Sequence, residues 1–276
     1  VEHMVAPTEA DSQLAYLNML GSENGGVDAV VTEDSDYLTF GCKHVIFKLK
    51  PDPAGPCEEI LRSDISGPGS SRGTNGYSFE NWTDELFKIF CCLLGCDYLK
   101  RVHGFGPKKV YAVLASAHEQ SGSSILEQVV NALKSYSAQY PGYPDLADPA
   151  YHLKLQRALL VFEHMYVYDP KSRDFVNLNP IPAHIRPIST VEGEVNDAED
   201  LDISFLNEHL VAPELRAALV RGDISPYNHE LYPVPAVSEW HIGNKETSCP
   251  CPQCTDNRAA RPLTAVPPPF NPYSVI

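Results

Sequence analysis

The chain has 276 residues, 43% of them hydrophobic, which is enough for one large domain or two small ones with a real core. Its formal net charge of −15 excludes a uniformly basic nucleic-acid-binding protein. A local basic face stays open, because only the charge close to a phosphate decides whether that phosphate is bound. No apolar run approaches the roughly 18 residues of a membrane-spanning helix, so the sequence predicts no membrane span.

The start of the chain and its cysteines indicate what kind of protein the chain comes from. The chain begins at Val1, directly before a structured motif and without a signal peptide, and we therefore expect a piece of a longer protein. Its eight cysteines do not form the pattern of a secreted disulfide framework. Cys91, Cys92 and Cys96 lie in an apolar helical run and are expected to be buried thiols, which favours an intracellular compartment.

The first fifty residues alternate between helical and strand patterns. Thr8 is the expected N-cap of a helix whose apolar face consists of Leu14, Ala15, Leu17 and Leu20. Residues 27–32 are β-branched and predict a buried parallel strand, and residues 44–49 predict a second strand. Residues 51–77 are rich in Pro, Gly and Ser without periodicity and are expected to form a loop or an insertion.

Helical patterns dominate the rest of the chain. A helix is predicted over residues 79–97, from Phe79 to a stop at Gly95. Further predicted elements are an amphipathic helix after residue 106, helices at 123–137 and 150–166, an extended piece at 175–178 and a small helical pair at 203–221. Six acids between Glu192 and Asp202 indicate a solvated, flexible segment. The Pro- and Cys-rich residues 236–276 are expected to be a disordered tail.

Three acidic clusters are candidates for a metal site: Glu9 with Asp11, Asp34 with Asp36, and Asp97. Asp34 and Asp36 directly follow a predicted strand, at the end where α/β sheets place their ligands. Mg²⁺ prefers such oxygen ligands, and two ions about 3.5–4 Å apart can activate water and stabilise a leaving oxygen in phosphodiester hydrolysis. The alternative for any one cluster is a turn or a helix cap.

A glycine loop is the candidate phosphate-binding element. The run Gly104-Phe105-Gly106-Pro107-Lys108-Lys109 follows one predicted helix and opens another. Glycine lets a backbone approach a ligand closely, proline suits the first helical position, and free amides at a helix start bind anions. The two lysines add positive charge. The alternative is a plain connection between helices with solvated lysines.

The tail contains a possible zinc-ligand set, Cys249, Cys251 and Cys254 with His241. A second ligand pair at standard zinc spacing is missing, so free thiols in a disordered tail are the expectation.

Taken in order, these motifs resemble the flap endonuclease superfamily of structure-specific 5′ nucleases, and most closely its exonuclease branch. The resemblance rests on residues 5–17, on Val30-Val31-Thr32-Glu33-Asp34-Ser35-Asp36, on Gly95-Cys96-Asp97-Tyr98-Leu99 and on the glycine loop. It covers roughly residues 3–245. Shorter matches are Phe40-Gly41-Cys42-Lys43, Tyr168-Asp169-Pro170 and Ser238-Glu239-Trp240-His241.

The resemblance implies an α/β fold: a parallel sheet flanked by helices with a helix–two-turn–helix DNA-binding element, that is, a PIN-like nuclease core incomplete at its N-terminus. Residues 1–235 would form the internal nuclease region. Within it, the DNA-binding element would occupy about 84–120 and a helical extension about 123–221. Family members also carry an N-terminal region with two more metal-site aspartates, basic residues that steer the scissile phosphate and a helical arch, which this sequence does not contain.

The implied function is metal-dependent 5′→3′ DNA exonuclease and 5′-flap endonuclease activity in DNA repair, in the nucleus, on duplex DNA with 5′ ends, flaps or gaps. Repair proteins are possible further partners. By carry-over, two Mg²⁺ ions, with Mn²⁺ as an alternative, are held directly or through water by Glu9, Asp11, Asp34, Asp36 and Asp97. Asp34 and Asp36 are also assigned to catalysis.

The same carry-over assigns DNA-backbone binding to the glycine loop, through Gly104, Gly106, Lys108 and Lys109. The family often holds a K⁺ ion at this hairpin with the help of a serine hydroxyl. Leu94 and Arg101 occupy the positions where that serine is expected, which argues against the ion here.

Two alternatives stay open from the sequence. Without the N-terminal region, this chain alone is expected to be inactive and could be a non-catalytic DNA-binding remnant of the same family. The other alternative is a helical interaction module whose acids are merely solvated.

Overall fold

The computed structural model describes residues 3–50, 55–66, 77–118, 124–183, 185, 201–206, 211–226 and 228–232. The chain divides into a larger unit, Asp11–Glu208, and a smaller unit made of Val1–Ala10 and His209–Ile276. No helix among the described residues is both long and apolar enough to cross a membrane.

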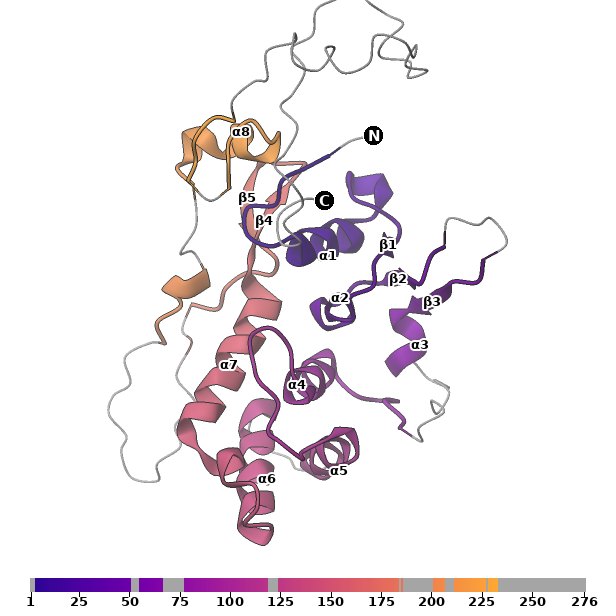
Figure 1. Ribbon diagram of the computed structural model, residues 1–276, viewed down its shortest axis with the longest axis vertical. Coiled ribbons are helices and arrows are strands. Elements are labelled where there is room, and N and C mark those ends of the chain that lie inside the picture. The colour runs from indigo at the N-terminus through magenta and orange to yellow at the C-terminus, as the bar shows by residue number, and fades with distance from the viewer. Residues whose placement is uncertain are drawn as a thin grey trace, which may run out of the picture. The chain divides into compact units, whose positions relative to one another are not determined.

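A small mixed sheet lies in the larger unit (Figure 1). Strands β1 (Val30–Val31) and β2 (His44–Phe47) are parallel, and β3 (Glu58–Leu61) pairs with β2 antiparallel. The predicted parallel pair is confirmed, although both strands are shorter than expected. The expectation of a parallel sheet is wrong in that the third strand is antiparallel. Within residues 51–77, where a loop or an insertion is expected, the described part contains β3 and a short helix. Strand β3 begins with two glutamates and is mostly exposed. Its sequence therefore lacks a clear strand pattern, and its extended conformation depends on pairing with β2.

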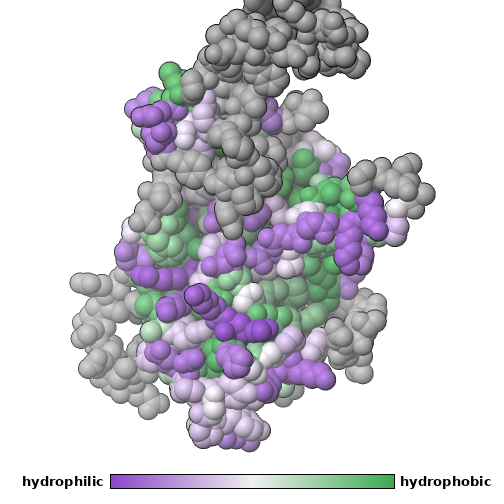
Figure 2. Space-filling model, in the orientation of Figure 1, coloured by the Kyte–Doolittle hydropathy of each residue, from purple (hydrophilic) through white to green (hydrophobic). Residues whose placement is uncertain are grey.

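One face of this sheet reaches the core and the other reaches the surface. Val45 and Phe47 of β2 are buried, whereas Val31 of β1 and Leu61 of β3 are exposed. Leu49, just after β2, is exposed as well. Figure 2 accordingly shows hydrophobic surface over the region of the small sheet.

Short helices surround the sheet. Helix α1 (Ala10–Leu20) and the turn η1 (Ser22–Asn24) precede β1, α2 (Asp36–Phe40) connects β1 to β2, and α3 (Arg62–Ser66) follows β3. The predicted first helix is confirmed, but it begins at Ala10, so Glu9 rather than the expected Thr8 directly precedes it.

Four longer helices complete the core: α4 (Asp84–Leu94), α5 (Pro107–His118), α6 (Ile125–Gln139) and α7 (Pro149–His164). In Figure 1 they gather below the sheet, where α4 contacts α5 and α7, and α5 contacts α6. The helix predicted from Phe79 begins only at Asp84, because the Thr83 hydroxyl accepts a hydrogen bond from the Leu86 amide at 3.2 Å and caps it. It ends, as predicted, at Gly95.

The elements after α6 are smaller. The 3₁₀ turn η2 (Pro144–Ala147) leads into α7, and β4 (Tyr166–Asp169) and β5 (Asp174–Asn177) form a hairpin that includes the predicted extended piece. The predicted helical pair at 203–221 is instead η3 (Ser204–Leu206), η4 (Pro213–Leu215) and the five-residue helix α8 (Arg216–Val220). Most of the acidic run at 192–202, the predicted tail at 236–276 and its candidate zinc ligands lie outside the described residues.

The cysteines were expected to be buried thiols, and this is confirmed in part. Cys92 is fully buried, whereas Cys91 and Cys96 are half-buried, and all three are free. Burial raises the pKa of Cys91 to about 11, so this thiol is protonated at neutral pH.

Helix α1 is attached to its neighbours by buried polar side chains as well as by an apolar face. Gln13 is fully buried; its amide donates to the Tyr168 carbonyl at 2.9 Å and accepts from the Tyr168 amide at 2.6 Å. The Asn18 oxygen accepts from the amides of Lys43 and His44 at 2.7 and 3.2 Å, and its nitrogen donates to Val27 at 3.3 Å. These bonds fix α1 against strand β4 and against the approach to β2.

Replacing Gln13 should therefore destabilise the larger unit. We expect Gln13→Leu to lower the free energy of unfolding by about 2–4 kcal/mol, because both backbone groups of Tyr168 lose their partners and each costs about 1–3 kcal/mol. Urea denaturation measures the loss. Gln139→Leu, at an exposed helix end, is the matched control and should change stability by less than about 0.5 kcal/mol. Equal effects of the two substitutions would contradict the assigned role of Gln13.

Candidate functional site

Four of the five predicted metal ligands belong to the larger unit. Asp11 lies in the first turn of α1, Asp36 begins α2, and Asp34 lies two residues earlier, after β1. Asp97 lies in the turn that follows α4. Asp34 and Asp36 thus occupy the carboxyl end of a parallel strand, as expected for a ligand site in an α/β sheet. Glu9 belongs to the smaller unit.

The turn after β1 is stabilised by its own polar groups. The Asp34 amide donates to the Thr32 hydroxyl at 3.0 Å, and one Asp34 carboxylate oxygen accepts from the Asp36 amide at 2.8 Å. Asp34 therefore stabilises a local turn, and a turn is the alternative to a metal site that the sequence leaves open for this motif. Glu33 in the same motif accepts from the Lys48 amide at 2.8 Å, so it fixes the chain after β2.

Two of the predicted ligands, Asp34 and Asp97, act on a third, Asp11. Burial raises the pKa of Asp11, and the negative charges of Asp34 and Asp97 raise it further. The buried Tyr37 hydroxyl donates a hydrogen bond to the Asp11 carboxylate and partly opposes this rise. Carboxylates from three separate segments of the chain thus act on the same region.

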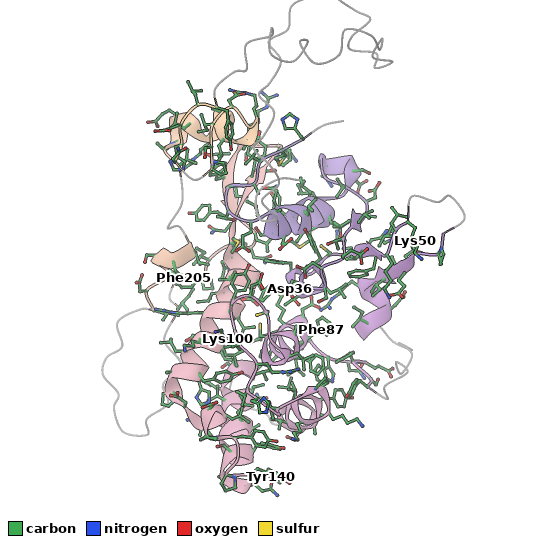
Figure 3. All side chains as sticks on the ribbon, in the orientation of Figure 1. Asp36, Lys50, Phe87, Lys100, Tyr140 and Phe205 are labelled. Carbon is green, nitrogen blue, oxygen red and sulfur yellow. The ribbon has the colours of Figure 1, made fainter. Side chains whose placement is uncertain are left out.

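Asp36 lies toward the end of α4. Its charge acts on Cys91, Cys92 and Cys96, and α2 contacts α4. Figure 3 places Asp36 close to this helix. The two aspartates of the Asp34–Asp36 motif therefore have different surroundings.

Within the part of the chain that is described, no three His, Cys, Asp or Glu side chains lie close enough to hold one metal ion. Like charges repel, so carboxylates without a bound cation have no reason to converge. The chemistry of the set nevertheless fits a hard divalent ion: the donors are all oxygen, and a cation would stabilise the charged form of Asp11, whose pKa is raised first by burial and then by the charges of Asp34 and Asp97. The ligand assignment stays a prediction.

The loop between α4 and α5 begins and ends with tight turns. Cys96 and Leu99 exchange backbone hydrogen bonds at 3.1 and 3.3 Å around Asp97. Phe105 is fully buried, and its neighbour Gly104 has a positive φ of 74°, a conformation that favours glycine. The predicted helix start at Pro107 is confirmed.

Two backbone donors of this loop are available to a ligand. Among the described residues, no intramolecular acceptor meets the amides of Gly106 or Lys108, which flank Pro107 at the start of α5. A Cβ added to Gly106 would meet no atom within 4 Å. The surface here is open, and it has the free N–H groups that bind anions at a helix N-terminus.

The two lysines of the loop differ. Lys108 is exposed, whereas the Lys109 ammonium donates to the Gly104 carbonyl at 2.8 Å and to the Tyr143 hydroxyl. The hydrogen bond with Tyr143 raises the pKa of Lys109, so this side chain stays charged. Tyr143 lies 34 residues away from Lys109, and no local pattern in the sequence predicts this pairing.

The loop is the basic part of an acidic protein. Residues 98–109 contain Lys100, Arg101, Lys108 and Lys109 and no acid. Lys100, Arg101 and Lys108 are exposed, and Figure 3 shows Lys100 beside α7 in this view. Residues 98–109 are thus positively charged in a chain whose net charge is negative, and they provide the local basic face that the sequence left open.

Known proteins are similar to this chain in sequence. The family model described as XPG I-region matches residues 1–97. Exonuclease 1 of Xenopus laevis is 35% identical over 187 residues, which make up 68% of this chain and 23% of that protein. The chain belongs to the flap endonuclease superfamily. Exonuclease 1 of Oryza sativa subsp. japonica is 30% identical over 257 residues, 91% of this chain and 26% of that protein.

Membership of the superfamily confirms the predicted resemblance, including its exonuclease branch, and implies a PIN-like α/β nuclease fold. The DNA damage-inducible protein DIN7 of Saccharomyces cerevisiae is 28% identical over 234 residues, 82% of this chain and 49% of that protein. The chain spans about a quarter of the length of the exonuclease 1 relatives.

The hydrogen bond between Tyr37 and Asp11 predicts a measurable titration effect. In metal-free protein, Tyr37→Phe should raise the pKa of Asp11 further, because it removes the donor that favours the carboxylate. A raised folded-state pKa means that stability falls as pH rises from the unfolded-state to the folded-state value, and the substitution should enlarge that fall. Carboxyl-carbon NMR titration in EDTA measures the pKa.

Tyr111→Phe is the matched control, because the Tyr111 hydroxyl donates to Ser78 at 2.7 Å and is not among the groups that act on Asp11. It should leave the pKa of Asp11 unchanged. An unchanged or lowered pKa of Asp11 in Tyr37→Phe would contradict the assigned contact.

Proposed function

We propose that this chain is part of a metal-dependent 5′→3′ DNA exonuclease and 5′-flap endonuclease of DNA repair. The observation that carries the proposal is the position of Asp34 and Asp36 at the carboxyl end of the parallel strand β1, together with Asp11 and Asp97 from two other segments, of which Asp11 is reached by the charges of Asp34 and Asp97. In an interaction module the acids would instead be scattered over the surface. Relatives named exonuclease 1 support the same activity.

In this proposal Glu9, Asp11, Asp34, Asp36 and Asp97 hold two Mg²⁺ or Mn²⁺ ions, directly or through water. The ions supply water activation and stabilisation of the leaving oxygen. The chain contributes orientation: the Asp36 amide fixes one oxygen of Asp34, and the Tyr37 hydroxyl fixes Asp11. Asp34 and Asp36 are the residues we assign to catalysis.

DNA binding is assigned to α4, the loop at 95–106 and α5, which together would form the helix–two-turn–helix element. The free amides of Gly106 and Lys108 would meet a backbone phosphate, and the Lys108 ammonium would add a charge-assisted contact. Such contacts are independent of base sequence, as a nuclease that acts on many sequences requires. A K⁺ ion in this loop is not part of the proposal.

A second candidate is a non-catalytic DNA-binding protein of the same family. It is favoured by one observation, that the Asp34 carboxylate accepts from the Asp36 amide at 2.8 Å and so stabilises its own turn. It would bind DNA through the same loop as the first candidate and would differ only in that it does not cut DNA. Nuclear localisation and repair-protein partners stay predictions from the family.

Cleavage of a 5′-flap duplex in Mg²⁺ separates the two candidates. We expect the 276-residue chain alone to bind the duplex with little cleavage, because its carboxylates leave an ion under-coordinated. In the longer protein that carries this chain, we expect cleavage that Asp34→Ala reduces by more than about 100-fold while DNA affinity is kept, since even outer-shell partners of a metal contribute about 10–100-fold.

Asp64→Ala, at an exposed aspartate of α3, is the control and should cut at the wild-type rate. Wild-type cleavage by Asp34→Ala would refute the metal assignment. Binding without cleavage by the longer protein would favour the second candidate.

Gly106 tests the DNA-binding surface separately. Gly106→Ala should keep or raise stability by up to about 1 kcal/mol, since its φ is ordinary and the new methyl group meets no atom. It should weaken duplex binding by about tenfold, because the methyl group holds a phosphate away from the free amides. Fluorescence anisotropy measures the affinity.

Gly142→Ala is the matched control, because a Cβ there also meets nothing within 4 Å and φ is not positive. It should not change DNA affinity. Equal affinities of Gly106→Ala and the wild type would remove the loop from the interface.

A further inference from the structure

Lys109 reaches back across its own loop. Its backbone lies in the first turn of α5, yet its ammonium donates to the Gly104 carbonyl at 2.8 Å, five residues earlier. The same ammonium donates to the Tyr143 hydroxyl, which itself donates to the Gly104 carbonyl at 3.3 Å. One loop carbonyl thus receives two side-chain donors from different parts of the chain.

Tyr143 is held firmly enough to act as an anchor. Its carbonyl accepts from the Ser137 hydroxyl of α6 at 2.9 Å. Its ring lies 6.0 Å from that of the fully buried Phe105 and 5.8 Å from that of Tyr136. Tyr143 therefore connects α6 to the loop at Gly104 and Phe105.

We propose that Lys109 and Tyr143 are positioning residues for DNA binding: they hold the Gly104 carbonyl turned inward, so that a phosphate meets the amides of Gly106 and Lys108. The inference rests on the proposed DNA-binding function of the loop, and it replaces the expected direct contact of Lys109 with DNA.

The chemistry explains why such a pair is needed. Gly104 has a positive φ and no side chain, so its peptide groups could rotate at little cost. A carbonyl oxygen that faced outward would repel a phosphate and leave the neighbouring amides badly aimed. Fixing the carbonyl before DNA arrives removes part of the ordering cost of binding. The Lys109 ammonium keeps its positive charge in the loop, but it donates its hydrogen bonds to the Gly104 carbonyl and the Tyr143 hydroxyl.

Salt dependence distinguishes a positioning lysine from one that contacts phosphate. Each lost phosphate contact lowers the slope of log affinity against log salt by about 0.9. We expect Lys108→Ala to show that change. Lys109→Ala should weaken duplex binding about five- to tenfold with less than half of that change in slope. Tyr143→Phe, which removes no charge, should weaken binding about two- to fivefold with no change in slope.

The double variant Lys109→Ala/Tyr143→Phe should bind no more weakly than Lys109→Ala alone, because both residues act through the Gly104 carbonyl. A second measurement needs no DNA. The NMR order parameters of the Gly106 and Lys108 amides should fall in Lys109→Ala and in Tyr143→Phe but not in Lys108→Ala.

The inference is overturned if Lys109→Ala lowers the slope as much as Lys108→Ala while Tyr143→Phe binds like the wild type. Unchanged order parameters in both Lys109→Ala and Tyr143→Phe also overturn it. Absence of salt-sensitive duplex binding by the wild type would instead refute the proposed function, and the DNA-free measurement would still decide whether the pair orders the loop.

Discussion

The two buried amide side chains of α1 are the constraint on which the rest of the larger unit depends. Gln13 binds both backbone groups of Tyr168 in β4, and Asn18 binds the backbone at the entry to β2. Apolar contacts tolerate sliding, whereas an amide that must satisfy two or three backbone groups fits only one placement. Because Asp11 lies on the same helix, this placement also fixes where its carboxylate lies relative to Asp34 and Asp97.

Helix α4 joins the acidic and basic parts of the proposed site. The turn at its end carries Asp97, and the chain then continues directly into the basic residues of the 98–109 segment. A phosphate bound at the start of α5 is therefore connected to the carboxylates through a short, hydrogen-bonded stretch of chain. This arrangement suits the proposed nuclease, which would have to hold a DNA backbone at a fixed distance from the proposed metal ligands.

The parts of the fold that the sequence predicts are those with local signals. The parallel pair β1 and β2 follows from β-branched runs, the end of α4 from Gly95, and the start of α5 from Pro107. Strand β3 could not be predicted, because its stability comes from pairing with β2. The site follows the same rule: the aspartates after strand and helix ends are visible in the sequence, whereas the contacts of Tyr37 and Tyr143 depend on tertiary structure.

Gln13 also has a consequence for how the molecule behaves at high concentration. In the hairpin, Tyr168 lies opposite Phe175, and its amide and carbonyl are both taken by the Gln13 side chain. These are the groups through which another chain could extend β4 as a new strand. A helix side chain thus occupies the outer edge of the hairpin at Tyr168, which leaves no backbone group of this residue for the addition of a further strand.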